Sequence, residues 1–286
     1  MQRLCRALAA GRRAAPRTAA VGLALGSAGG VFTAHGAAAS ADPHSPGLPD
    51  AENTQASGSW RLNLGRTSGY WGDARWYDHQ IDRKLHRVGE MIEELVYALP
   101  PLPAGTRVAD LCAGSGRAAL ALLRAYPEAH VTLVDMDTRR TGIAVEEARR
   151  LGLGRQVSVL EAVVDADAPA DAVIDGGPAA GYHLITATCA IRVIANPPAH
   201  YTPPGGGSVA PAAESKHEAV ARRYRQLFAL ALRSLAPGGH LIVGDHSGAL
   251  GLYDQMRLME EAGFTEVDVA WRSRDWFVCG GRRPLE

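Results

Sequence analysis

Residues 107–117 read R-V-A-D-L-C-A-G-S-G-R, and this stretch decides the fold. An apolar run, typical of a buried parallel strand, leads into a loop with two glycines and then into a helix-forming segment. A second apolar run ends in Asp135, nineteen positions after Gly116. This order of strand, glycine loop, helix and acid-ended strand is typical of sites for adenosine-containing cofactors. It predicts that backbone at Gly114 and Gly116 approaches such a cofactor and that Asp135 accepts hydrogen bonds from its ribose hydroxyls.

The glycine spacing alone does not select the cofactor, because G-S-G-R-A-A also satisfies the loose dinucleotide pattern G-x-G-x-x-G/A. Asp110, four residues before Gly114, distinguishes between the possible cofactors. A dinucleotide places its pyrophosphate at the N-terminus of the following helix, where a carboxylate would repel it. S-adenosylmethionine instead carries an ammonium and a sulfonium, which a carboxylate attracts. The sequence therefore favours S-adenosylmethionine.

The stretch D-L-C-A-G-S-G resembles the first motif of class I S-adenosylmethionine-dependent methyltransferases, an acidic residue followed by x-G-x-G-x-G. Cys112 stands where glycine is commonest in that family. Residues 235–245, L-A-P-G-G-H-L-I-V-G-D, resemble the family's L-x-P-G-G corner before its fifth strand. The resemblance implies a Rossmann-like, doubly wound α/β fold with a mostly parallel seven-stranded sheet and an antiparallel last strand. The cofactor contacts that we predict are Asp110, Ala113, Gly114, Ser115, Gly116, Asp135, Met136, Asp165 and Thr188.

The elements expected downstream agree with this fold. Helical and strand patterns alternate over residues 75–284, which predicts right-handed βαβ units in a parallel sheet. Asp165 and Asp167 follow the third strand, where the family has an acid that binds the adenine amino group. We prefer Asp165 because it comes first, although both side chains could simply be solvated. We expect helices at 83–99, 117–125, 139–151, 215–235 and 252–262, and strands at 130–134, 156–164, 182–188, 240–245, 265–271 and 275–279.

The fourth strand has two interpretations. Residues 182–188 resemble the Y-D-L-I-x-A pattern of small-molecule methyltransferases, with His183 in place of the aspartate. Residues 191–198 could instead be a strand that ends in N-P-P, similar to the N-P-P-Y motif with which nitrogen methyltransferases hold their target through an asparagine. Here the aromatic residue, Tyr201, comes two positions late. We favour the first interpretation, in which Asn196 belongs to an inserted loop, and an Asn-Pro turn without chemistry is a third.

Methyl transfer from a sulfonium mainly requires alignment and exclusion of water, so a base is needed only if the acceptor loses a proton. Histidine suits that role, and His246, His200 and His183 are the catalytic candidates. Residues 70–79, Y-W-G-D-A-R-W-Y-D-H, are rich in aromatic side chains, as expected of a lid over a ligand or of a hydrophobic cover for the sheet. The candidate substrate contacts are Tyr70, Trp71, Trp76, Tyr77, Asn196 and Tyr201.

Charge is unevenly distributed along the chain. Thirty basic and thirty acidic residues balance over 286 residues, but residues 1–42 hold five arginines and a single acid, Asp42. The remainder therefore has a small acidic excess, which disfavours a nucleic-acid substrate. The arginine-rich start indicates a mitochondrial presequence, with plastid import or export as alternatives. Residues 18–40 lack charge, but their glycines and alanines make a poor membrane span, and the four cysteines show no metal-ligand spacing.

These observations predict four parts: a targeting presequence at 1–42, a linker at 43–68, a helical lid segment at 69–100 and a methyltransferase domain at 101–286. The predicted function is methyl transfer from S-adenosylmethionine to a small molecule. Two alternatives stay open. One is nitrogen methylation of a protein or nucleic acid through Asn196, and the other is a cofactor-binding module without catalysis. The sequence indicates neither the acceptor atom nor an oligomeric state.

Overall fold

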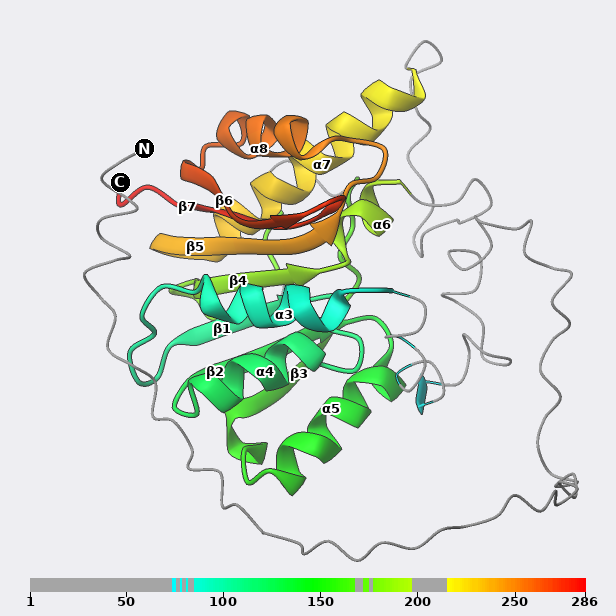
Figure 1. Ribbon diagram of the computed structural model, residues 1–286. Helices are drawn as coiled ribbons and strands as arrows, with labels where there is room; N and C mark the ends of the chain where they lie inside the picture. The colour runs from blue at the N-terminus through cyan, green and yellow to red at the C-terminus, as the bar shows by residue number, and fades with distance from the viewer. Residues whose placement is uncertain are drawn as a thin grey trace, which may run out of the picture. The chain divides into compact units, whose positions relative to one another are not determined.

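Seven strands form one sheet in the order β3-β2-β1-β4-β5-β7-β6 (Figure 1). The first five strands pair in parallel, and β7 pairs antiparallel with both β5 and β6. The predicted mostly parallel sheet with an antiparallel last strand is therefore confirmed. The strands are β1 (Arg107–Leu111), β2 (His130–Asp135), β3 (Val157–Glu161), β4 (Tyr182–Thr188), β5 (Leu235–His246), β6 (Thr265–Ser273) and β7 (Trp276–Arg282).

The computed structural model describes residues 74, 75, 78, 81, 85–167, 172–174, 177–196 and 215–286. The presequence and linker predicted at 1–68 lie outside these residues. So do six of the predicted site residues, which are Tyr70, Trp71, Trp76, Tyr77, His200 and Tyr201. None of the helices in the described part of the chain is long and apolar enough to span a membrane.

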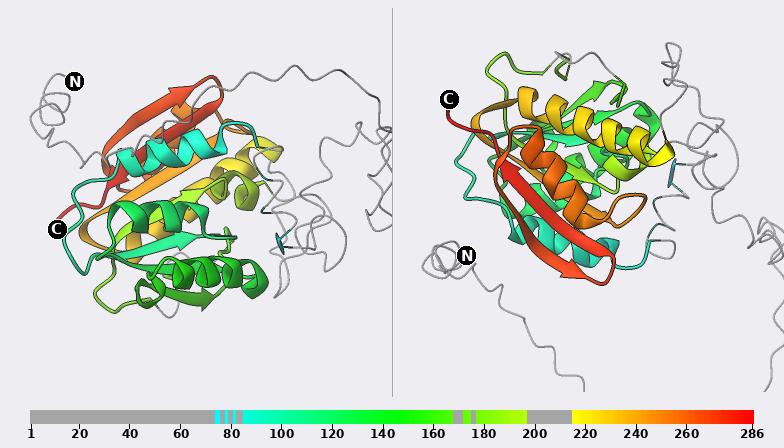
Figure 2. Two further views of the ribbon diagram at one scale, coloured as in Figure 1. Left: turned by 60° about the horizontal axis from the view of Figure 1, so that its bottom comes forward. Right: turned by 90° about the horizontal axis from the view of Figure 1, so that it is seen from above.

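Helices cover both faces of the sheet (Figures 1 and 2). On one face lie α3 (Val88–Tyr97), α4 (Arg117–Ala125) and α5 (Thr138–Arg150), with the short 3-10 helix η3 (Gly154–Gln156) after α5. On the other lie α6 (Ile191–Ala195), α7 (Lys216–Ser234) and α8 (Leu252–Glu261).

The strands supply core residues to the two faces alternately, because successive side chains of a strand point to opposite sides. Val108 and Leu184 belong to the hydrophobic cluster under α3, α4 and α5. Ala109 and Ile185, one position further along, belong to the cluster under α6, α7 and α8. This burial on both faces explains why the strands read as apolar runs rather than as an alternation of polar and apolar residues.

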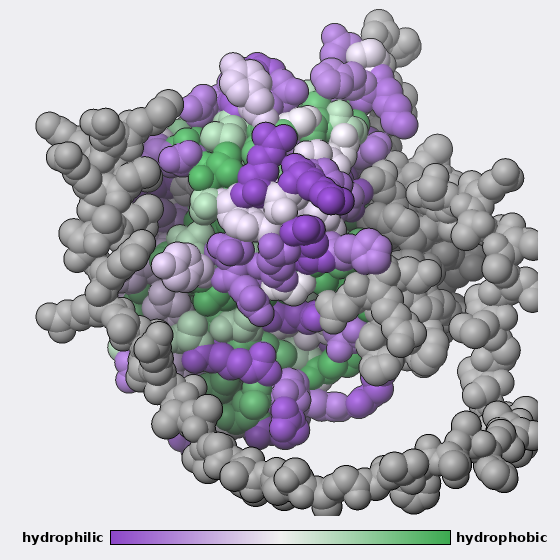
Figure 3. Space-filling view, in the orientation of Figure 1, coloured by the Kyte–Doolittle hydropathy of each residue, from purple (hydrophilic) through white to green (hydrophobic). Residues whose placement is uncertain are grey.

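Helix α3 belongs to the segment that was predicted as a lid. Its buried residues Val88, Met91, Ile92 and Leu95 recur at helical spacing and face the sheet. The outer surface of α3 is largely hydrophilic (Figure 3). This helix therefore covers the sheet. The aromatic stretch 70–79, for which a lid and a hydrophobic cover were both expected, lies mostly outside the described residues.

The structure shows which part of residues 182–198 forms the fourth strand. β4 occupies Tyr182–Thr188 and pairs with both β1 and β5. Residues 191–195 form α6, so the alternative strand that ends in N-P-P is wrong. Asn196 is the C-cap residue of that helix.

The corner before β5 differs in detail from the expectation. α7 begins with a capping box between Ser215 and Glu218 and ends at Ser234. The strand then starts at Leu235 rather than at His240, and its pairing with β4 shifts register between Tyr182 and Leu184. The Pro-Gly-Gly sequence is thus absorbed as an irregularity within the strand.

Candidate functional site

The candidate site lies where the carboxyl ends of β1, β2, β4 and β5 meet at one edge of the sheet. From β1 the chain moves outward to β2 and β3, and it then returns to build β4 and β5 on the other side of β1. Ligands of such sheets bind outside the strand ends at this switch point, here between β1 and β4. The predicted glycine loop directly follows β1 and therefore lies at this point.

The two glycines of the loop have different structural roles. Gly114 and Gly116 both have left-handed backbone conformations, with φ of 54° and 70°. A Cβ on Gly116 would overlap the Cβ of Ala144, so this glycine allows α5 to pack closely. Among the described residues, no atom would lie within 4 Å of a Cβ on Gly114. Gly114 therefore borders open space, as expected of backbone that a ligand approaches.

Cys112 also has a positive φ, of 53°, in the same loop. Glycine adopts this left-handed conformation without strain. A cysteine is strained in this conformation, which is a cost that the surrounding loop must offset.

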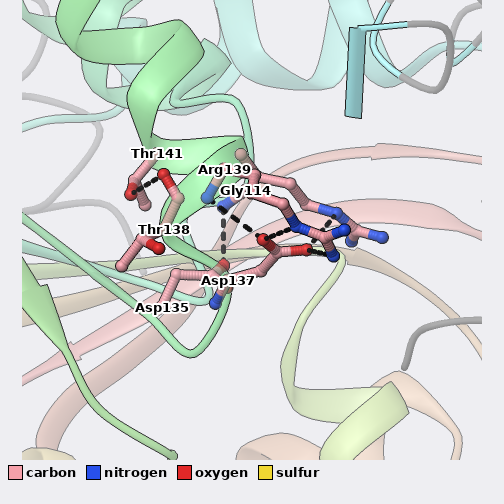
Figure 4. Close-up of polar contacts among 7 residues, drawn as sticks. Gly114, Asp135, Asp137, Thr138, Arg139 and Thr141 are labelled. Carbon is pink, nitrogen blue, oxygen red and sulfur yellow. Dashed lines mark hydrogen bonds and ion pairs between the residues drawn. The ribbon is translucent and has the colours of Figure 1, made fainter. Parts of the chain in front are cut away.

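Asp135 holds the loop from the end of β2 (Figure 4). Its Oδ2 accepts a hydrogen bond of 2.8 Å from the amide of Gly114, and its Oδ1 accepts one of 2.9 Å from the amide of Asp137. Each carboxylate oxygen can accept a further bond, so the predicted ribose contact is compatible with this arrangement. The structure adds a role that the spacing did not indicate, since Asp135 also fixes the backbone conformation at Gly114.

Asp137 instead belongs to the helix that follows. Its side chain caps α5 by accepting the amide of Arg139, and it forms an ion pair of 2.8 Å with the Arg139 guanidinium. The hydrogen bond from Arg139 lowers the pKa of Asp137. A substitution of Asp137 is therefore a suitable control for a substitution of Asp135.

Asp110 near the end of β1 is fully buried. Its Oδ1 accepts a 2.9 Å hydrogen bond from the hydroxyl of Thr186, whereas its Oδ2 has no hydrogen-bond partner among the described residues. Burial raises the pKa of Asp110 to about 7, although the bond from Thr186 opposes the shift. A buried carboxylate with an unsatisfied oxygen is costly unless a cation or donor completes it. The ammonium of S-adenosylmethionine is such a group, so Asp110 and the open space at Gly114 both fit this cofactor.

The segment before α3 contacts this site. The hydroxyl of Ser115 donates a hydrogen bond to the Oδ1 of Asp78. Arg75 forms a 2.6 Å ion pair with Glu146 of α5. Asp78 was missed in the sequence, although it lies in the aromatic-rich stretch 70–79, because the aromatic side chains there carried the only signal.

At the start of α3, Arg87 donates a 2.9 Å hydrogen bond to the hydroxyl of Ser273, the last residue of β6. The segment before α3 thus contacts the glycine loop through Asp78, and Arg87 contacts the end of β6, which lies beyond β5 in the sheet. These contacts support the expectation that residues just before α3 cover part of this edge of the sheet.

The remaining cofactor candidates lie in the glycine loop after β1 and after the ends of β2, β3 and β4. Met136 follows Asp135 and is 47% exposed. Asp165 accepts the amide of Asp167, and Asp167 forms ion pairs of 2.7 and 3.2 Å with Arg222 and Arg223 of α7. These arginines engage Asp167 in the protein itself, which supports the choice of Asp165 for the adenine. The other two candidates, Ala113 and Thr188, lie in the glycine loop and at the end of β4.

A second polar cluster lies at the end of β5. Asp245 is almost fully buried and faces Arg192 of α6, with 3.5 Å between Arg192 Nε and Asp245 Oδ1. The backbone amides of Arg192 and His246 also donate to the Asp245 carboxylate. A Cβ on Gly248 would overlap the side chain of Arg192. His246 packs its ring against Trp276, with 4.9 Å between the ring centroids.

The structure separates the histidine candidates. His246 lies at the same edge of the sheet as Asp110, two strands away. His183 lies at the opposite edge, where its Nδ1 accepts a 3.0 Å hydrogen bond from the amide of Arg107 at the start of β1. His183 lies near the amino end of β4, about the length of the strand away from the glycine loop, and is therefore not a catalytic candidate. No group of three or more possible metal ligands occurs in the described parts of the chain.

Comparison with known proteins identifies the class. The family model of the methyltransferase small domain matches residues 91–267, which is more than half of the chain. The chain therefore belongs to this methyltransferase family, and its fold is that of the class I methyltransferases. No curated protein shows significant sequence similarity to it.

Two solved structures illustrate the similarity of fold. The S-adenosylmethionine-dependent methyltransferase SibL, in its apo form, is 19% identical over 72% of this chain and 59% of its own, with a TM-score of 0.50. An O-methyltransferase family protein from Burkholderia thailandensis is 15% identical over 78% of this chain and 66% of its own, with a TM-score of 0.52. The chain thus covers less than two thirds of the length of either protein. At these identities the similarity concerns the fold alone.

Proposed function

We propose that this protein transfers a methyl group from S-adenosylmethionine to a small-molecule acceptor. The observation that carries the proposal is the buried Asp110 carboxylate, whose Oδ2 is unsatisfied, beside a glycine loop with open space at Gly114. When bound, S-adenosylmethionine supplies a methyl group that its sulfonium has already activated. The protein then has to align the acceptor and exclude water.

The residues of the site divide these tasks. Asp110 would hold the cofactor's ammonium and Asp135 its ribose, while Asp165 and Met136 would contact the adenine. The chain before α3, represented by Asp78, would shield this edge from water. A small acceptor is consistent with the acidic excess outside residues 1–42, because an enzyme for nucleic acids needs a basic surface.

Calorimetry with Asp135→Ala tests the cofactor assignment. The wild type should bind S-adenosylmethionine and S-adenosylhomocysteine. Loss of the charged acceptor should weaken both at least about tenfold, since a hydrogen bond to a charged group contributes about 1.5 to 3 kcal/mol. Asp137→Ser is the matched control, because serine also caps a helix and should leave affinity unchanged. Binding of NAD(P) without any response to the two sulfur compounds would refute the proposal.

The alternative acceptor, an amide or amino nitrogen held by Asn196, has its own test. Asn196 ends a short helix rather than a strand, which removes the structural context of an N-P-P-Y motif. We therefore expect Asn196→Ala to change the turnover number less than about threefold and to act, if at all, on the Michaelis constant. A loss of about a hundredfold in turnover, in a folded variant with normal cofactor affinity, would favour nitrogen methylation instead.

We also propose that the protein is imported into mitochondria, on the basis of the five arginines within residues 1–42.

A cofactor-binding module without catalysis is the competing function. Both functions need the glycine loop and its two carboxylates, so only an assay of methyl transfer distinguishes them. Binding of S-adenosylmethionine with no methyl transfer to any acceptor would support that alternative.

A further inference from the structure

His246 lies at the carboxyl end of β5, the same end of the parallel strands that carries the glycine loop. It is the last residue of β5, and β5 lies next to β4, which in turn lies next to β1 with the glycine loop. With the cofactor at the switch point between β1 and β4, an acceptor bound on the β4 side of it would lie near the carboxyl end of β5. The half-buried His246 lies at that end of the strand.

The orientation of the imidazole ring is fixed on two sides. The Nδ1 atom lies 3.1 Å from the carbonyl oxygen of Ser247. A carbonyl can only accept a hydrogen bond, so Nδ1 carries the proton and Nε2 keeps its lone pair. The ring of Trp276 packs against the imidazole at a centroid distance of 4.9 Å. The amide of Ser247 donates a 2.7 Å bond to the carbonyl of Asp275, which anchors the loop itself.

Burial favours the neutral form of this ring. The charged groups that face it are Arg192 from α6, Asp245 from β5 and Asp275 from the turn between β6 and β7. Burial lowers the pKa of His246, and the positive charge of Arg192 lowers it further, against the opposing effect of Asp245. The lowered pKa favours the neutral, proton-accepting form of the imidazole.

We propose that His246 is the general base of the methyl transfer and that the acceptor is a hydroxyl group, which has a proton to lose. This inference rests on the proposed function. The acceptor oxygen forms a bond to the methyl carbon as the bond from that carbon to sulfur breaks, and the bonding electron pair remains on sulfur. The hydroxyl proton passes to Nε2 of His246, and the imidazolium then releases it to water. Arg192 is a positioning residue in this scheme, because it holds Asp245 and the start of the loop.

The first test does not depend on activity. Nitrogen NMR of the protein labelled with ¹⁵N-histidine, with His246 assigned through His246→Gln, reports the tautomer and the pKa. We expect the proton on Nδ1 and a pKa below the ordinary value of about 6.5. A proton on Nε2, or a pKa at or above that value, would overturn the proposal.

The second test compares acceptors. Labelled S-adenosylmethionine is supplied with catechol and phenol, which have a hydroxyl proton to lose, and with dimethyl sulfide and nicotinamide, whose accepting atoms have none. Label should enter the phenols, and His246→Gln should lower that turnover about a hundredfold or more with unchanged cofactor affinity. Label in dimethyl sulfide or nicotinamide that persists in His246→Gln would overturn the assignment of His246.

His240→Gln is the matched control for both tests. His240 lies in the middle of the same strand, away from its carboxyl end, is also partly buried, and also has a lowered pKa because of burial. It should behave as the wild type. The tests distinguish failure of the proposed function from failure of the proposed base. The absence of any binding of S-adenosylmethionine or S-adenosylhomocysteine would refute methyl transfer itself. Normal binding with an unaffected His246→Gln variant would refute only the general base.

Discussion

Asp110 shows how one residue links the stability of the protein to its cofactor. Its pKa is raised to about 7 because the carboxylate is buried, whereas in the unfolded chain it has the ordinary value of about 4. Between these two pH values the folded state holds a proton that the unfolded state has lost. The contribution of Asp110 to the free energy of unfolding therefore falls as pH rises from about 4 to 7.

A cation at Asp110 should reverse this effect and displace the proton. We predict that binding of S-adenosylhomocysteine at pH 6.5 releases protons, because its ammonium lowers the pKa of Asp110 below the buffer pH. Titration calorimetry in phosphate and in Tris measures the released protons as a difference in apparent enthalpy, with the more negative value in Tris. Asp110→Asn should remove most of this difference. Equal enthalpies in both buffers for the wild type would show that the ammonium does not lie at Asp110.

At the residue scale, the sequence predicted positions better than contacts. Asp110, Gly114 and Asp135 were predicted because their spacing along one strand-loop-helix unit is fixed by local geometry. Asp78 and the bond between Asp135 and the Gly114 amide were not, since they join residues 21 or more positions apart through packing. His183 and His246 look alike in the sequence, and only the direction of each strand shows which end carries the site.

At the scale of elements, the glycine loop should separate binding from stability. We predict that Gly116→Ala destabilises the protein by about 1 to 3 kcal/mol, because the new Cβ overlaps Ala144 of α5 and φ is positive. Gly114→Ala has open space around its Cβ and should cost only the backbone strain of about 1 kcal/mol. Its main effect should be weaker cofactor binding. Chemical denaturation and calorimetry on both variants check this, and similar losses of stability would contradict it.

The helices were predicted within a few residues, but the meaning of residues 191–198 could not be read from their pattern. An apolar run of this length suits a short buried strand as well as a helix turn. The structure makes it α6, and the contact of Arg192 with the buried Asp245 ties that helix to the end of β5. A pair 53 positions apart gives no periodic signal, so the sequence alone left the choice open.

At the scale of the whole molecule, the presequence is the part that the described fold does not test. We predict that residues 1–45 fused to a fluorescent protein direct it into mitochondria of a eukaryotic host, because the segment carries five arginines and one acid. Replacing the five arginines by glutamine should abolish import. Microscopy with a mitochondrial marker is the measurement. Diffuse cytosolic fluorescence would contradict the prediction, while plastid or secreted signal would select one of the alternatives.

The place of β7 in the sheet sets the moment at which the fold can be completed. β7 follows β6 in the chain, yet it lies between β5 and β6 and is the strand that joins them. Until the ribosome has added residues 276–282, β5 remains an open edge and the nascent chain lacks the buried side chains of Phe277 and Val278. Domains fold as units once their elements are present. The sheet therefore cannot be completed before residues 276–282 have left the ribosome, whatever part of the chain has folded by then.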